Sequence, residues 1–396
     1  MHKEARQAFN ESFTDARYKA FTGGMDADFP GQLDFRVAET PVFIPAGLKE
    51  KMLDASDGII DAILSPDFRE KTDRAVPKDQ YVPGESAHTS FLAIDFAICR
   101  DANGELVPQL IELQGFPSLF GYQAYLAESF KKHFPIPADF NYAFGLSYES
   151  YIEKLKTLIL GNEDPEQVIL LDIFPEKQKT RIDFVVTEQM LGIKAVCYTR
   201  LQRDGRKLYY EKNGRRVQVK RIYNRLIFDE LQCYPDLETS YRFTDEVDVT
   251  WVGHPNWFFR ISKFSMPFLK GSYIPDTRFV SDYEGNYPAD LENYVLKPLF
   301  SFAGSGVQLH VDAAMLAALS DPENYILQRK VTYEPVIQAP DGLVKCEIRL
   351  MYGWPDQAER PELMMGLSRL SRGEMIGVRF NKDFTWVGGS ACFFEP

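Results

Sequence analysis

Hydrophobic and polar positions alternate along two short segments between Phe91 and Tyr122, and this pattern predicts a β-hairpin. The Asn103-Gly104 pair between the segments is typical of a tight hairpin turn. The first segment is apolar at every second position, at Leu92, Ile94, Phe96 and Ile98. Three side chains with oxygen atoms interrupt the two apolar strands, namely Asp95, Glu112 and Gln114.

Helical periodicity dominates the segments on either side of this hairpin. The clearest helix is predicted over residues 46 to 64, before Pro66, and another over residues 148 to 160, closed by Gly161. The first ninety residues are mixed and largely helical. A further helical stretch is predicted over residues 256 to 272.

Short apolar strands separated by one helix begin at Gln167. Strand patterns at 168–173 and 194–199 flank a predicted helix at 180–191, and this β-α-β order predicts a small parallel-sheet domain. Residues 200 to 221 then carry nine basic and two acidic side chains. Their two turns, each ending in glycine, favour a solvated hairpin over a site for a polyanion.

Composition narrows the class of protein. The 396 residues leave room for two or three domains, and 45% hydrophobic with 26% charged residues is typical of a soluble globular protein. A net charge of -12 argues against general affinity for nucleic acid or anionic membranes. The five cysteines lack metal-ligand spacing, the first residues lack the apolar core of a secretory signal, and no apolar run approaches membrane-spanning length. We therefore expect a cytoplasmic location.

The polar residues of the hairpin suggest a magnesium site. Glu112 and Gln114 are two apart in a strand, so their side chains share one face. A carboxylate in each apolar strand, at Asp95 and Glu112, is costly to bury without a cation. Two carboxylates and an amide carbonyl suit magnesium, which prefers hard oxygen ligands. The alternative is a hairpin whose polar residues face water.

A second candidate site follows the strand that carries Lys297. Gly304 and Gly306 would let backbone amides approach phosphate oxygens, and Ser301 and Ser305 add hydroxyl donors. The spacing matches neither a Walker loop nor the dinucleotide fingerprint, and a plain turn is the alternative.

Two later segments add polar residues to strand patterns. Residues 343 to 352 place Lys345, Glu347 and Arg349 on one face, which predicts a polar cleft or a salt-bridged outer surface. Residues 378 to 389 contain Asn381 and a glycine pair, and a terminal hairpin is their alternative explanation.

Taken in order, these segments resemble the ATP-grasp superfamily, in which ATP lies between two α+β lobes. The resemblance rests on VLKP, the Gly-rich hairpin, the LQRKV hinge and the KCEIR strand, and on a hairpin similar to the superfamily's metal module. Here the metal module precedes the other segments, an order that resembles the circularly permuted, glutathionylspermidine synthetase-like branch. The resemblance covers roughly residues 85 to 130 and 165 to 396, and residues 1 to 80 match nothing known.

The resemblance implies a mixed α+β and α/β fold in five segments. These are a mainly helical N-terminal segment (1–80), the metal-binding half of the C-lobe (81–160), a pre-ATP-grasp α/β domain (165–255), the N-lobe with the Gly-rich loop (256–325) and the remainder of the C-lobe (326–396).

It also implies roles for individual residues. Magnesium would be held by Asp95, Glu112 and Gln114, although the family has Asn at position 114; Gln offers the same amide carbonyl on a longer arm. Lys297 and Arg349 would be catalytic. The implied nucleotide-binding residues are Lys263, Lys297, Phe302, Ala303, Gly304, Ser305, Gly306, Gln328, Arg329, Lys330, Val331, Glu347 and Asn381.

The activity implied is ATP-dependent joining of a carboxylate to an amine or thiol through an acyl phosphate, on a small molecule or peptide. The alternatives are a phosphotransferase and a non-catalytic nucleotide-binding module, the latter suggested by Gln114. Four arginines are candidates for gripping a substrate carboxylate, at positions 36, 225, 369 and 372, and Arg225 is the one we retain. The sequence identifies neither the general base nor the substrates.

Overall fold

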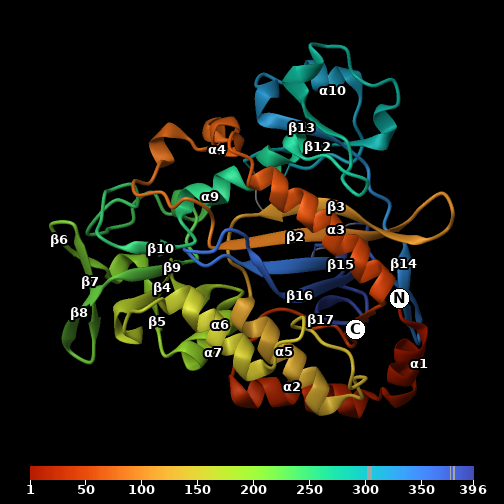
Figure 1. Ribbon diagram of the computed structural model, residues 1–396, viewed down its shortest axis with the longest axis horizontal. Coiled ribbons are helices and arrows are strands. Elements are labelled where there is room, and N and C mark those ends of the chain that lie inside the picture. The colour runs from red at the N-terminus through yellow and green to blue at the C-terminus, as the bar shows by residue number, and fades with distance from the viewer. Residues whose placement is uncertain (301–305, 375, 378–379) are drawn as a thin grey trace.

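The computed structural model describes residues 1–396 except 301–305, 375 and 378–379, and its largest sheet lies at the centre (Figure 1). Strand order in this sheet is β1-β17-β16-β15-β2-β3, and β14 pairs with β15. Neighbours are antiparallel except β1 and β17. The strands are β1 (Val42–Ile44), β2 (Phe91–Arg100), β3 (Leu106–Gln114), β14 (Pro335–Ala339), β15 (Gly342–Gly353), β16 (Glu362–Ser371) and β17 (Gly388–Phe394).

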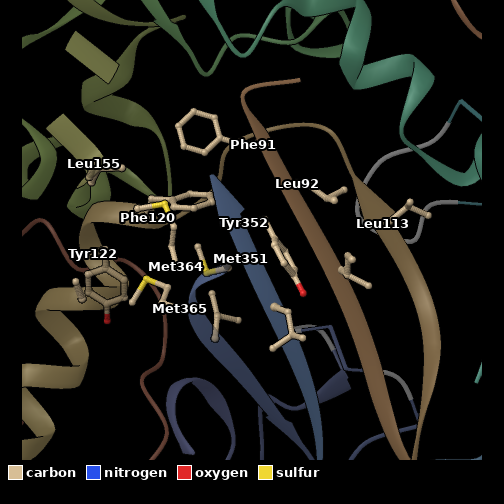
Figure 2. Packing of buried hydrophobic residues seen from close by; sticks show 14 of the residues in the cluster. Phe91, Leu92, Leu113, Phe120, Tyr122, Leu155, Met351, Tyr352, Met364 and Met365 are labelled. Carbon is tan, nitrogen blue, oxygen red and sulfur yellow. The ribbon is translucent and has the colours of Figure 1, made fainter. Parts of the chain in front are cut away.

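Helices cover the large sheet (Figure 1). The main hydrophobic core contains residues of both the sheet and these helices. Figure 2 shows Phe91 and Tyr352 of the sheet packed near Phe120 of a covering helix. Leu92, Ile94, Phe96 and Ile98 are fully buried, as the alternation predicts. The α-helices outside the smaller lobes are α1 (Lys3–Ser12), α2 (Asp15–Asp28), α3 (Ala46–Ile63), α4 (Phe68–Lys71), α5 (Phe120–His133), α6 (Tyr148–Leu160), α8 (Phe228–Gln232) and α9 (Pro255–Arg260).

A parallel sheet stands beside the large one (Figure 1). Its order is β10-β9-β4-β5, and α7 (Arg181–Leu191) joins β4 to β5 as the β-α-β pattern predicts. The strands are β4 (Val168–Asp172), β5 (Lys194–Cys197), β9 (Arg221–Asn224) and β10 (Thr250–Val252). The basic segment forms an antiparallel meander of β6 (Gln202–Asp204), β7 (Lys207–Lys212) and β8 (Arg215–Val219), so the hairpin prediction is confirmed.

A third, smaller lobe lies above the large sheet in Figure 1. It contains the antiparallel strands β11 (Thr277–Phe279), β13 (Tyr325–Arg329) and β12 (Tyr294–Pro298), together with α10 (Ala313–Ala317). This lobe has its own apolar cluster, separate from the main core, formed by Val280, Tyr283, Tyr294, Leu296, Val311, Leu316 and Leu327.

The segment before the small lobe is less helical than its pattern predicts. The α-helix α9 ends at Arg260, and only a 3-10 helix, η6 (Lys263–Phe268), follows. Pro267 lies inside η6 and has no N–H to continue an α-helix. The other 3-10 helices are η1 (Asp73–Ala75), η2 (Lys78–Gln80), η3 (Pro165–Gln167), η4 (Pro175–Lys177), η5 (Tyr198–Arg200), η7 (Val280–Tyr283), η8 (Leu291–Asn293) and η9 (Pro322–Asn324).

Candidate functional site

Strand register brings the predicted polar residues to one face of the large sheet. Asp95 on β2 lies opposite Glu112 on β3 and opposite Arg349 on β15. Two residues before Arg349 on β15, Glu347 lies opposite Arg369 on β16. Side chains at opposed positions of antiparallel strands share a face, so β3, β2, β15 and β16 together build one polar surface.

Asp95 is the centre of this surface. Arg349 holds it in a two-pronged contact, with Nε 2.6 Å from Oδ1 and Nη2 2.6 Å from Oδ2, while Arg369 Nη2 lies 2.9 Å from Oδ2. Asp95 is 1% exposed and Arg349 7%. Burial by itself raises the pKa of the Asp95 carboxyl, but attraction to the arginines outweighs it and leaves this pKa lowered.

Glu347 is held from two sides. Arg369 donates to its Oε1, and the Tyr333 hydroxyl donates to Oε2 at 2.9 Å. Burial raises the pKa of Glu347 against the opposing attraction of Arg369. The sequence did not point to Tyr333, and Arg369 was only one of four candidate arginines, because both contacts depend on pairing between distant strands.

Glu112 and Gln114 end the hairpin. Gln114 Nε2 donates to Glu112 Oε1 at 3.0 Å, so the Gln114 amide oxygen remains as an acceptor. The oxygen donors match magnesium in type. Among the residues that the structure describes, however, no group of three or more His, Cys, Asp and Glu side chains is arranged to hold a metal ion. Asp95 and Glu347 are instead engaged by arginines.

Two lysines approach Glu112 from the small lobe and its preceding segment. Lys297 Nζ donates to the Ile111 carbonyl at 3.2 Å, and Lys263 Nζ donates to the Pro298 carbonyl at 3.0 Å. Burial lowers the pKa of Lys297, and it lowers the pKa of Lys263 to about 8, while the charge of Glu112 opposes both shifts. Both ammonium groups therefore lie over the carboxylate end of the hairpin.

The Gly-rich loop is described only at its end. Phe302, Ala303, Gly304 and Ser305 lie outside the described residues. Gly306 has a φ of +73°, and a β-carbon there would lie 2.9 Å from Pro298 Cγ. This position therefore requires glycine for conformation and for space.

The LQRKV hinge, whose Gln328, Arg329, Lys330 and Val331 are implied to bind nucleotide, is the end of β13 and the residues after it. Its Arg329 and Lys330 amides already donate to Asp276 and Asn293 carbonyls, at 2.8 and 2.7 Å. Gln328 is 2% exposed, and its side-chain nitrogen has no hydrogen-bond partner within the described part of the chain. Val331 packs against a small apolar cluster on the polar side of the large sheet, which contains Ala97, Cys99, Val107, Ile111, Tyr273 and Tyr333.

Asn381 lies in a loop and stabilises it. Its side-chain oxygen accepts from the Arg372 and Gly373 amides at 2.9 and 3.0 Å, and its nitrogen donates to the Gly377 carbonyl at 3.0 Å. These contacts give Asn381 a structural role in the described residues.

Arg225 lies away from the lysines, just after β9. Its Nη1 is 2.5 Å from Asp183 Oδ2, and both side chains are buried. Asp172, at the end of β4, lies nearby with Glu230. Burial and the neighbouring Glu230 raise the pKa of Asp172 well above its ordinary value, although Arg225 opposes the shift. The next strand in the chain, β5, lies on one side of β4, and the later strand β9 lies on the other side. Ligands of parallel sheets usually bind at the carboxyl end of the strands where the order reverses in this way.

No family model matches the chain, and no curated protein matches its sequence. Among solved structures, the chain is similar to the apo form of a glutathione synthetase-like effector, GSS30, from Globodera pallida. The TM-score is 0.60 at 12% identity, with 97% of this chain and 98% of that chain covered. This chain and that protein share a fold. The mixed α/β fold expected from the sequence is consistent with this likeness.

The likeness covers 97% of this chain and therefore includes most of residues 1 to 80. No helix among the described residues is long and apolar enough to cross a membrane.

Proposed function

We propose that this protein is an ATP-dependent ligase of the ATP-grasp type, with its metal module permuted ahead of the nucleotide-binding lobe. The observation that carries the proposal is that Lys263 and Lys297 lie near Glu112, which is opposite Asp95 in the large sheet. Two cations beside a carboxylate, next to the apolar cluster that contains Val331, suit a nucleoside triphosphate with its ion.

In this proposal the lysines bind phosphate oxygens, and Asp95, Glu112 and the Gln114 carbonyl hold magnesium. The bound ion would neutralise charge on the phosphates. A substrate carboxylate oxygen attacks the γ-phosphorus and ADP leaves; an amine then attacks the acyl carbon, and phosphate leaves as the amine loses a proton. Lys297 and Arg349 position and neutralise the transferring phosphoryl group.

The substrate site that fits this proposal is the corner at the end of β4 and β9. Arg225 would orient a substrate carboxylate there, although its charge is already balanced by Asp183. Asp229, beside Glu230 on α8, lies close enough to Lys263 to affect its pKa. In this proposal the corner and the phosphate site are neighbours, as transfer between them requires.

The first test is magnesium-dependent ADP release from ATP with pools of amino acids, short peptides and polyamines. We expect one pool to stimulate release, and Glu112→Ala to reduce it about a hundredfold or more. Glu105→Ala is the matched control, because Glu105 is exposed in the same hairpin and pairs only with Lys51 in the described ion pairs. Release that is insensitive to Glu112→Ala would contradict the proposal.

Two alternative functions give different products in the same assay. A product that retains the γ-phosphate on a hydroxyl would identify a phosphotransferase. ATP binding without turnover on any acceptor would identify a non-catalytic nucleotide-binding module, which the engagement of Asp95 by two arginines favours as the second candidate.

A further inference from the structure

Arg369 lies among three carboxylates, two of which, Asp95 and Glu112, would hold a metal ion in the proposed function. Its Nη2 bonds both Asp95 and Glu347, and the charge of Glu112 also acts on it. These three carboxylates raise the pKa of Arg369 against the effect of burial. The Arg369 guanidinium thus supplies the positive charge that buried carboxylates require. In other sites a divalent cation supplies this charge.

The two arginines that touch Asp95 differ in how firmly they are held. Arg349 is 7% exposed and forms two parallel bonds to one carboxylate. The Arg369 side chain is 38% exposed, and its buried Nε has no hydrogen-bond partner among the residues that the structure describes. Arg369 therefore has one N–H group that makes no hydrogen bond among the described residues, and part of its side chain faces solvent, so that the guanidinium has room to move.

We propose that Arg369 is an internal counter-cation that excludes divalent metal from Asp95, Glu112 and Glu347 until nucleotide phosphate draws its guanidinium away. The inference rests on the proposed nucleotide site. Phosphate oxygens bind guanidinium groups bidentately, and the unpartnered Nε gives Arg369 a donor for such a contact. A divalent ion beside the three carboxylates would be repelled by Arg369 in its present position, so the two cations compete for one place.

Mn²⁺ binding to the nucleotide-free protein, followed by electron paramagnetic resonance, tests the exclusion directly. We expect wild type to bind Mn²⁺ weakly and Arg369→Gln to bind it about tenfold more tightly or better, because a charged competitor is removed. Arg369→Lys keeps a positive charge and should bind as weakly as wild type. Adding Glu112→Gln to Arg369→Gln should cancel the gain.

Arg372→Gln is the matched control. Arg372 follows the same strand, but it pairs with the exposed Asp341 outside the carboxylate group. It should leave Mn²⁺ binding unchanged. Equal Mn²⁺ affinity of wild type and a folded Arg369→Gln protein would overturn the inference, as would tight Mn²⁺ binding by wild type alone.

Nucleotide binding without metal gives the second readout and needs no turnover. In EDTA, a fluorescent ADP analogue should bind Arg369→Gln about tenfold more weakly than wild type, since a charged hydrogen-bond donor is lost. Equal affinity would overturn the claim that phosphate attracts Arg369. If the analogue fails to bind wild type even with magnesium, the proposed nucleotide site is wrong. The Mn²⁺ titration still tests independently whether Arg369 excludes divalent metal.

Discussion

Lys297 is the side chain whose removal should weaken nucleotide binding most directly. Its ammonium group is desolvated, since burial lowers its pKa, and it lies beside Glu112 and Glu347. Losing a charged donor to phosphate costs about 1.5–3 kcal/mol, so Lys297→Met should reduce affinity about tenfold to hundredfold. Titration with a fluorescent ATP analogue measures this. Lys270→Met, at an exposed position in the segment before β11, should leave affinity unchanged.

Replacement of Asp172 by a neutral residue should make the protein more stable. Its pKa is raised in the folded state, so the unfolded state releases this proton first as pH rises and stability falls above the ordinary pKa. Asp172→Asn keeps the Oδ1 acceptor for the Ile173 amide and removes the free-energy cost of ionising a buried carboxyl group. Thermal unfolding at pH 7.5 should show a higher stability for Asp172→Asn than for wild type, because each tenfold difference in proton affinity between the folded and unfolded states is worth about 1.4 kcal/mol.

The gain from Asp172→Asn should be much smaller near pH 4, where the carboxyl is protonated in the folded state and about half protonated in the unfolded state. Asp236→Asn, at an exposed position, should show no gain at either pH. A gain that is the same at pH 4 and pH 7.5 would rule out the ionisation of Asp172 as its cause.

Individual site residues were predictable only where a local pattern fixed their orientation. Glu347 and Arg349 are two apart in one strand, so their shared face follows from the alternation alone. Arg369 contacts Asp95 across 274 positions of sequence, through the pairing of β2, β15 and β16. A single sequence contains no local pattern for that register, and therefore it could not separate Arg369 from the other candidate arginines.

Two glycines in helices should respond oppositely to alanine. A β-carbon at Gly23, in the exposed interior of α2, would meet no heavy atom within 4 Å. Gly23→Ala should therefore stabilise the fold by up to about 1 kcal/mol. A β-carbon at Gly121, in the first turn of α5, would lie 2.4 Å from Thr187 Oγ1 of α7, so Gly121→Ala should destabilise it by about 1–3 kcal/mol. Denaturant unfolding of both variants decides this, and shifts of the same sign would contradict the packing.

Elements with strong local patterns were predicted well. The hairpin from Phe91 became β2 and β3, and the predicted helices at 46–64, 148–160 and 180–191 became α3, α6 and α7 with ends within one residue. Turn glycines and apolar spacing determine such elements locally. The stretch after Pro255 was predicted too long, because aromatic residues there pack around a 3-10 turn and Pro267 rather than along one α-helix.

At the scale of the whole molecule, the proposed nucleotide site joins two lobes with separate apolar cores. Hydrogen exchange with and without an ATP analogue should therefore show slower exchange in β2 and β3 and also in β12 and β13, although almost two hundred residues separate these hairpins. Saturation at a hundred times Kd stabilises the bound state by about 2.7 kcal/mol, enough to slow local opening strongly. The meander β6–β8, which is remote from the lysines, should be unaffected. The Lys297→Met protein should lose the protection in both lobes together, whereas protection confined to one lobe would mean that the nucleotide does not bridge the sheets.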